Sequence, residues 1–261
     1  MTFASRAAAQ MPERLLVRLI SLVYGQFEPE IRHLDEVCGR GGTMLDIGGW
    51  YGPWTRRLVG RADQLVVIEP TPLHGVLRRT LPPAVDVIAA AASDHRGEAE
   101  LWLPPSGGES RGVSSLHRRG IHGTSMKVPL VTVDGLGLRN VTFMKIDVDG
   151  HEVPVLRGAA GTIKRDHPRL LVEVEQRIQQ ITDVTDLVES WGYRGWVRPS
   201  RQWVPVSAVP LAAHQASTSR VSERGLLARA LWPYPRYINS VLFLPGSQIP
   251  RSAEDHARQA A

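Results

Sequence analysis

A glycine-rich turn follows the first strongly apolar run of the chain. The turn reads D-I-G-G-W-Y-G, from Asp46 to Gly52. Glycine allows a tight turn and a close approach of the backbone to a ligand. The spacing G-G-x-x-G differs from the dinucleotide fingerprint G-x-G-x-x-G, and the Asp46 carboxylate would repel a pyrophosphate but attract a cation. The turn therefore favours S-adenosylmethionine, which carries an ammonium and a sulfonium, over a nicotinamide dinucleotide.

A second acidic residue, Glu69, ends the next apolar run and lies 17 residues after Gly52. An acidic side chain at this place in nucleotide-binding α/β proteins accepts hydrogen bonds from ribose hydroxyls. Nicotinamide and methionyl cofactors both contain that ribose, so Glu69 predicts an adenosine ligand without choosing between them. The alternative is a structural role, in which the carboxylate lies at the N-terminus of the helix expected after Pro70.

The elements that must position these residues are short apolar runs separated by segments of helical length. Segments 53–60, 72–80 and 151–165 have helical length, and the chain alternates between the two kinds of element, which predicts a doubly wound α/β fold. Ligands of such folds bind at the carboxyl ends of the parallel strands. The predicted strands are TMLDIGG, QLVVIEP, VDVIAAAASD, VTFMKIDVDG, RLLVEVE and a final run INSVLFLP. Polar residues at the strand ends are Asp46, Glu69, Ser93, Asp147 and Glu173.

The composition predicts one folded domain with additions at its ends and within it. Residues 1–42 are expected to form a helical lead-in, and residues 43–246 the main domain. Within that domain, the Gly-, Ser- and Arg-rich segment 104–127 predicts a long surface loop, and 197–236 an irregular insertion. Both are candidate acceptor-binding elements. Residues 247–261 predict a disordered tail.

Charge and cysteine usage narrow the function classes. Hydrophobic residues make up 43% of the 261 positions and charged residues 22%, which excludes collagen-like and mostly disordered chains. The net charge of +5 comes from dispersed arginines without interleaved aromatics, so a solvated surface is favoured over nucleic-acid binding. The single cysteine, Cys38, predicts a reducing, cytoplasmic location. No apolar run approaches the roughly 20 residues of a membrane span.

Several segments of the chain, in order, resemble the FkbM family of S-adenosylmethionine-dependent methyltransferases. The resemblance covers about residues 43–176, and the block VTFMKIDVDGHEVPVLRGA is more specific than the glycine-rich turn. Two positions depart from the family pattern, because bulky residues follow Gly49 and because Asp149 stands where Glu is more frequent. The other similar segments are DIGGWYG, VIEP, AAASDHRGEAELWLP, VPLVTVDGL and HPRLLVEVE.

This resemblance implies a class I methyltransferase fold, which is a Rossmann-like, mostly parallel seven-stranded sheet with helices on both faces. It also implies transfer of a methyl group from S-adenosylmethionine to a hydroxyl oxygen of a sugar or polyketide-like acceptor. The implied cofactor residues are Asp46, Gly48 and Gly52 for the methionine part, Glu69 for the ribose, and Ala92 with Ser93 for the adenine.

The resemblance further implies that Asp147 lies beside the reacting methyl group. A sugar hydroxyl is a poor nucleophile until its proton leaves, so a general base is expected within hydrogen-bond reach. His151 is the predicted base, because an imidazole with a pKa near 6.5 suits that task and a neighbouring carboxylate would orient it. The alternative is a helix-start histidine that binds a local carbonyl group.

The acidic residues near Asp147 raise the question of a metal. Lys145, Asp147 and Asp149 alternate in the sequence, as do Glu173 and Glu175 in the next apolar run. Such carboxylates allow a Mg²⁺ ion that would lower the pKa of the acceptor hydroxyl. An internal ion-pair network between Lys145 and the Glu residues is favoured instead, since a buried charge requires a partner. No zinc-binding spacing of Cys and His occurs in the sequence, so we predict no metal ligands.

The predicted activity is therefore O-methylation of a monosaccharide, oligosaccharide or glycoside. A polyketide or lipid-linked hydroxyl is the first alternative, and an RNA-directed methyltransferase is a weaker one. Late aromatic residues either stack on a sugar ring or belong to the core. The acceptor and the methylated hydroxyl are not encoded in any motif, and a homodimer is an open option. These aromatic residues are Trp191, Trp196, Trp203, Trp232, Tyr234 and Tyr237.

Overall fold

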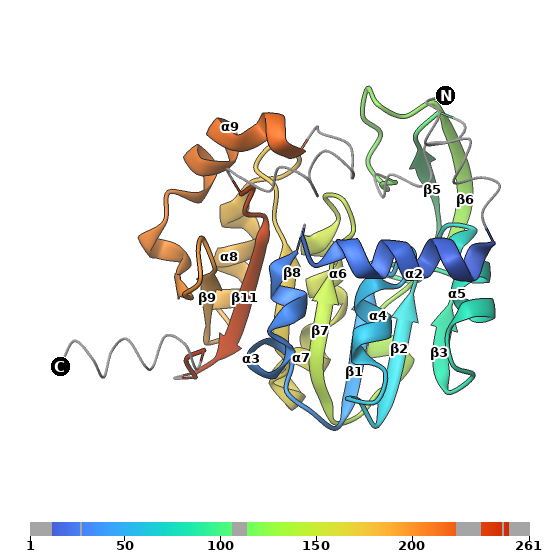
Figure 1. Ribbon diagram of the computed structural model, residues 1–261, viewed down its shortest axis with the longest axis horizontal. Helices are drawn as coiled ribbons and strands as arrows, with labels where there is room; N and C mark the ends of the chain where they lie inside the picture. Colours follow the sequence, from blue (N-terminus) through green and yellow to red (C-terminus); the bar gives the residue numbers. More distant parts are fainter. Residues whose placement is uncertain (1–11, 27, 106–113, 223–235, 247, 251–261) are drawn as a thin grey trace.

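The computed structural model describes residues 12–26, 28–105, 114–222, 236–246 and 248–250 (Figure 1). These residues form an α/β fold with two β-sheets. The predicted disordered tail lies mostly outside the described residues. No helix in the described part of the chain combines the length and the apolar character needed to cross a membrane.

The larger sheet has eight strands in the order β10-β9-β11-β8-β7-β1-β2-β3. Neighbouring strands from β8 to β3 are parallel, whereas β11 is antiparallel to β8 and β9, and β10 is antiparallel to β9. The expected seven-stranded, mostly parallel sheet is thus corrected to eight strands of mixed orientation. The strands are β1 (Thr43–Ile47), β2 (Gln64–Ile68), β3 (Val85–Ile88), β7 (Val141–Ile146), β8 (Arg169–Glu173), β9 (Tyr193–Val197), β10 (Val204–Pro205) and β11 (Ser240–Pro245).

The predicted strands match β1, β2, β3, β7, β8 and β11, but β9 and β10 were not predicted. The sequence of β9 is Y-R-G-W-V, in which exposed Arg194 and a glycine interrupt the apolar run. Glycine and a charged residue weaken a strand pattern. The strand forms because β11 and β10 pair with its two edges.

Helices cover both faces of the larger sheet (Figure 1). Successive side chains of β1 point to opposite faces, so Met44 packs with Trp54 and Leu58 on one face. Leu45 packs with Leu156 on the other. On the Met44 face lie α2 (Glu13–Tyr24), η1 (Pro29–Arg32), α3 (Leu34–Val37), α4 (Pro53–Leu58) and α5 (Leu73–Thr80), and on the Leu45 face α6 (Glu152–Gly158), α7 (Ala160–Asp166) and α8 (Ile181–Glu189).

The smaller sheet comprises β4 (Ala91–Ala92), β6 (Thr124–Val131) and β5 (Gly97–Leu103), in that spatial order. β5 and β6 form an antiparallel pair, followed by η3 (Asp134–Leu136). The surface loop predicted over 104–127 is therefore shorter at its C-terminal end, since residues 124–127 belong to β6. The high Gly and Ser content before Thr124 concealed the start of that strand.

The segment 197–236, predicted to be irregular, contains η4 (Val206–Ala208) and a helix, α9 (Leu211–Ser222). The helix sequence L-A-A-H-Q-A-S-T-S-R-V-S has no apolar stripe, which explains why the sequence did not indicate it. Trp196 and Trp203 are buried in the core with Leu242, so they are not available for stacking on a sugar. Trp232 and Tyr234 lie outside the described residues.

Candidate functional site

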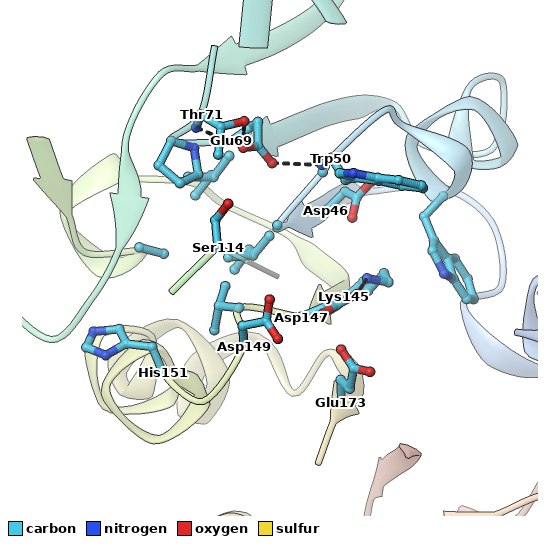
Figure 2. Close-up of a pocket in the computed structure, with 18 of the residues that line it drawn as sticks. Asp46, Trp50, Glu69, Thr71, Ser114, Lys145, Asp147, Asp149, His151 and Glu173 are labelled. Atoms are coloured by element: carbon cyan, nitrogen blue, oxygen red, sulfur yellow. Dashed lines mark hydrogen bonds and ion pairs between the residues drawn. The ribbon is translucent and has the colours of Figure 1, made fainter. Parts of the chain in front are cut away.

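A cavity opens at the carboxyl ends of the parallel strands and contains about 1500 Å³ free of protein atoms, including space open to solvent. The strand register creates it, because the last residues of β2, β1, β7 and β8 are aligned. The residues that follow or end these strands meet at one edge of the sheet, as predicted from the sequence. In the cavity wall these are Gly48, Glu69, Asp147 and Glu173 (Figure 2).

The glycine-rich turn packs the end of β1 against the end of β7. Gly48 has φ of +85°, and a Cβ built there would lie 1.8 Å from the carbonyl oxygen of Asp147, so only glycine fits. Trp50 also has a positive φ, of 48°. Gly48 and Gly49 line the cavity. Gly52 is the N-cap residue of α4 and is not among the residues that line the cavity. It therefore lies in the turn behind the cavity wall.

Asp46 provides a buried carboxylate oxygen in the cavity wall. The residue is 1% exposed, and its Oδ2 accepts a hydrogen bond from Thr55 Oγ1 at 2.5 Å. Its Oδ1 is buried without a hydrogen-bond partner in the described part of the chain. Burial raises the pKa of Asp46, and the Lys145 ammonium opposes this shift. An unsatisfied buried acceptor costs about 1–3 kcal/mol, so a ligand with a cationic donor fits this position.

Glu69 is held rigidly where β2 ends. Its Oε2 accepts the N–H of Trp50 at 2.7 Å, and its Oε1 accepts the N–H and the hydroxyl of Thr71 at 2.8 and 2.6 Å (Figure 2). Burial raises its pKa, while these hydrogen bonds oppose the shift. A carboxylate has about four lone-pair sites, so about one site on Oε2 stays free for a ligand hydroxyl.

Ala92 and His151 line the cavity, whereas buried Ser93 lies behind them. The Nε2 of His151 is 2.9 Å from Ser93 Oγ, and its Nδ1 is 3.3 Å from Nε2 of His117. Burial lowers the pKa of His151 to about 4, with a further contribution from His117. The ring is therefore neutral at pH 7 and binds side chains rather than a local carbonyl. Its role as the general base stays a prediction.

A charged pair and a second carboxyl group occupy another part of the cavity, away from His151 in Figure 2. Lys145, which is 4% exposed, binds Asp147 with Nζ 2.7 Å from Oδ2. Lys145 is thus in an internal ion pair, but its partner is Asp147 and not one of the predicted glutamates. Glu173 forms a hydrogen bond with Asp147 from the neighbouring strand. One carboxyl of the two must supply the proton of that bond.

The electrostatics assign that proton to Glu173. Burial raises the pKa of Asp147, but the Lys145 ammonium and the hydrogen bond from Glu173 bring it below its ordinary value. Burial and the Asp147 charge both raise the pKa of Glu173 well above its ordinary value. Burial alone would lower the pKa of Lys145, yet the surrounding carboxylates raise it, so the lysine is always charged. Of the two carboxyl groups, Glu173 therefore holds a proton more readily than Asp147, which Lys145 keeps in its charged form.

Four further wall residues come from segments outside the parallel strands, and of these the sequence analysis considered only Tyr237, as a possible stacking partner of a sugar. Glu28 accepts hydrogen bonds from Tyr24 Oη at 2.6 Å and from Trp54 Nε1 at 2.5 Å. The side-chain amide of Asn239 donates to Glu173. No motif marks these positions, because only the packing of the chain ends places them. The four residues are Tyr24, Glu28, Tyr237 and Asn239.

Part of the predicted surface loop also reaches the cavity. Ser114 and Leu116 line it, and Ser115 Oγ donates to the carbonyl of Asp149 at 2.7 Å. Asp149 has a positive φ of 53°, and its carboxylate lies 3.4 Å from the Arg119 guanidinium. Burial and the Asp147 charge raise the pKa of Asp149 well above its ordinary value. The strained turn after β7 is thus clamped by the segment before β6.

Within the described residues, no group of three or more His, Cys, Asp and Glu side chains is arranged to hold a metal ion. The Lys145 ammonium lies among the charges of Asp147, Glu28 and Asp46, where a metal cation would otherwise compensate them. The Mg²⁺ option considered from the sequence therefore gains no support from this site.

The cavity at the strand ends of this α/β fold combines Asp46 within β1, a glycine-rich turn after β1 and Glu69 after β2, as the resemblance to methyltransferases predicted. The sequence matches the methyltransferase FkbM domain over residues 46–194, which is more than half of the chain. The protein therefore belongs to the FkbM methyltransferase family. No curated protein sequence matches this chain.

Similar solved structures include a methyltransferase FkbM from Methylobacillus flagellatus, with 16% sequence identity and a TM-score of 0.49. The match covers 92% of this chain but 58% of the Methylobacillus chain. A precorrin-8w decarboxylase from Methanobacterium thermoautotrophicum is 10% identical, with a TM-score of 0.44 and coverage of 83% and 89%. A precorrin-6y C5,15-methyltransferase from Geobacter metallireducens is 12% identical, with a TM-score of 0.41 and coverage of 65% and 72%.

Proposed function

We propose that this FkbM-family protein is an S-adenosylmethionine-dependent O-methyltransferase with a class I methyltransferase fold, and that its acceptor is a sugar or glycoside hydroxyl. The observation that carries the proposal is the buried Asp46 Oδ1, which has no partner in the described part of the chain and lies in the cavity wall. A cationic amine at this position would satisfy it. A pyrophosphate would be repelled there, which disfavours a dinucleotide.

The residues along this edge fit the successive parts of the cofactor. Asp46 and the backbone of Gly48 would hold the methionine end, and Oε2 of Glu69 would accept a ribose hydroxyl. Ala92 would border the adenine, with Ser93 supporting it from behind. When bound, S-adenosylmethionine supplies a methyl group that the sulfonium already activates. The protein's remaining tasks are to orient the acceptor and to take its proton.

Asp147 is the favoured proton acceptor of the two candidates, and His151 is the other. Lys145 lowers the pKa of Asp147 and keeps it ionised, and Glu173 lies beside it on the neighbouring strand. Asp147 would become neutral when it takes the acceptor proton. His151 has one ring nitrogen near Ser93 and the other near His117, so both of its nitrogens already have side-chain partners.

The chemistry of the cavity wall supports a sugar over the other acceptor classes. The rings of Tyr24 and Trp50 both line the cavity, with centroids 5.9 Å apart, and aromatic faces stack well on sugar rings. Anionic RNA is disfavoured, because acidic side chains outnumber Lys145 and Arg177 in the wall. A long apolar acceptor would leave these acids without polar partners. The acids are Glu28, Asp46, Glu69, Asp147, Asp149, Glu173 and Glu175.

Calorimetric titration with S-adenosylhomocysteine and with NAD tests the cofactor half of the proposal. We expect micromolar binding of S-adenosylhomocysteine and no binding of NAD. A protein that binds neither would overturn the proposal. Methyl transfer is then measured with labelled S-adenosylmethionine and a panel of free sugars and glycosides. A cytoplasmic location and a homodimeric assembly are retained as proposals from the sequence.

A further inference from the structure

The cavity divides into two parts with different origins. We use "cofactor half" for Asp46, Gly48, Glu69 and Ala92. The "acceptor half" comprises Tyr24, Glu28, Lys145, Asp147, Glu173, Tyr237 and Asn239. Four of these seven acceptor-half residues, Tyr24, Glu28, Tyr237 and Asn239, lie outside residues 46–194, the part of the chain that matches the family domain. Residues outside the family domain are therefore available to select the acceptor of this particular protein.

Glu28 is an acceptor-half residue whose carboxylate is fixed at both oxygens. Each of its oxygens accepts one hydrogen bond from an aromatic donor, Oε1 from Tyr24 and Oε2 from Trp54. Trp54 is fully buried in the core beneath the sheet, so this donor cannot move away. Each carboxylate oxygen keeps about one further lone-pair site. Glu28 is therefore pre-organised to accept a hydrogen bond from a molecule in the cavity.

The charges of the acceptor half are not balanced by its cations. Among the ion pairs of the described residues, Lys145 binds Asp147 and Arg177 binds Glu175 at 2.5 Å. Glu28 has hydrogen bonds but no ion-pair partner in this set, and burial raises its pKa although Lys145 opposes that shift. The negative charge of Asp147 raises the pKa of Glu28 further. A cation that enters beside Glu28 would compensate its charge at short range.

We infer that Glu28 is a specificity-determining residue that binds a protonated amino group of the acceptor, so that the preferred acceptor is an amino-bearing sugar or glycoside. This inference rests on the proposed methyl transfer. Neutral sugars are weaker ligands because they leave the Glu28 carboxylate uncompensated. Phosphorylated sugars are the weakest, because like charges repel in the acceptor half.

The test compares three probes, glucosamine, glucose and glucose 6-phosphate, on the full chain saturated with S-adenosylhomocysteine. Binding is measured by calorimetry for the wild type and for Glu28→Gln, Glu28→Asp and the control Glu13→Gln. Glu13 lies on the same N-terminal segment but pairs with exposed Arg79, outside the cavity. We expect glucosamine to bind the wild type at least about tenfold more tightly than glucose, which is about 1.4 kcal/mol.

In Glu28→Gln the preference for glucosamine should fall below about threefold, while affinity for S-adenosylhomocysteine stays within about twofold of the wild type. Glu28→Asp, which keeps the charge, should retain an intermediate preference, and Glu13→Gln should match the wild type. A Glu28→Gln variant that still prefers glucosamine, or a wild type that prefers glucose or binds no probe, would overturn the inference. Failure of the wild type to bind S-adenosylhomocysteine would instead remove the proposed function.

Discussion

The cofactor half of the cavity comes from neighbouring strand ends, whereas the acceptor half combines strand ends with residues from both ends of the chain. Asp46 and Glu69 occupy their places because β1 and β2 are parallel and in register. Glu28 occupies its place only because the N-terminal segment packs against Trp54 of α4, and Asn239 occupies its place because β11 pairs with β8. Sheet topology therefore fixes where the cofactor-half residues lie, whereas tertiary packing fixes where Glu28 and Asn239 of the acceptor half lie.

The first prediction has the largest expected effect and tests whether the two halves have separate roles, in proton transfer and in cofactor binding. Asp147→Asn removes the favoured proton acceptor and should lower kcat by about 10²- to 10⁴-fold. Affinity for S-adenosylhomocysteine should change little, because Asp147 belongs to the acceptor half. Steady-state kinetics and calorimetry measure the two quantities on the same preparation. Asp86→Asn, at an exposed position on β3, is the matched control and should behave like the wild type. An equal loss of kcat and of S-adenosylhomocysteine affinity would contradict the separate roles of the cofactor half and the acceptor half.

The second prediction is the converse change in the cofactor half. Asp46→Asn keeps an acceptor for the Thr55 hydroxyl but removes the charge that would bind the cofactor ammonium. A hydrogen bond to a charged group contributes about 1.5–3 kcal/mol, so we expect affinity for S-adenosylhomocysteine to fall by about 10- to 100-fold. Calorimetry checks this value, and unfolding curves check that the variant folds. Unchanged affinity would mean that the unpartnered Oδ1 serves another ligand.

The sequence was sufficient to predict most of the cofactor half. Polar residues that end apolar runs indicate a strand-end site, and parallel register then brings Asp46, Glu69 and Asp147 together. Asn239 could not be predicted in this way. It lies beside Glu173 because Ser240, the first residue of β11, pairs with Glu173 across an antiparallel connection. No local pattern encodes which strand a late segment will join.

The lack of a local sequence pattern also explains why some strands were not predicted. β9 and the smaller sheet were missed, since β9 contains Arg194 and Gly195 and β6 follows a Gly- and Ser-rich segment. Long-range pairing stabilises both in spite of weak local preference. Glu28 is the corresponding case in the site, because its hydrogen bond to Trp54 spans 26 residues. Contacts between residues far apart in the sequence determine where the acceptor-half residues lie.

A third prediction concerns the turn that joins the two halves after β7. Glu152 accepts the N–H groups of Val148 and Gly150, and burial raises its pKa to about 7. A carboxyl with a raised folded-state pKa favours folding when protonated, so stability should fall as pH rises from about 4.5 to about 7. The contribution is about 3 kcal/mol. Urea unfolding at several pH values measures it.

Glu152→Gln should remove this part of the pH dependence, because glutamine accepts the same N–H groups without titrating. A pH slope of equal size in the variant and the wild type would assign it to other carboxyls, of which Asp149 and Glu173 are the nearest with raised pKa values.

The smallest effect is expected for His151→Ala. The ring lies between Ser93 and His117, on the adenine side of the cavity, and both of its nitrogens have side-chain partners there. With Asp147 as proton acceptor, kcat should fall less than about tenfold, while S-adenosylhomocysteine affinity falls a few-fold because Ser93 loses a partner. His117→Ala, which leaves the Ser93 contact intact, is the control. A loss of kcat above about 10²-fold at unchanged affinity would make His151 the general base and move the proton-accepting group from the acceptor half to the border of the cofactor half.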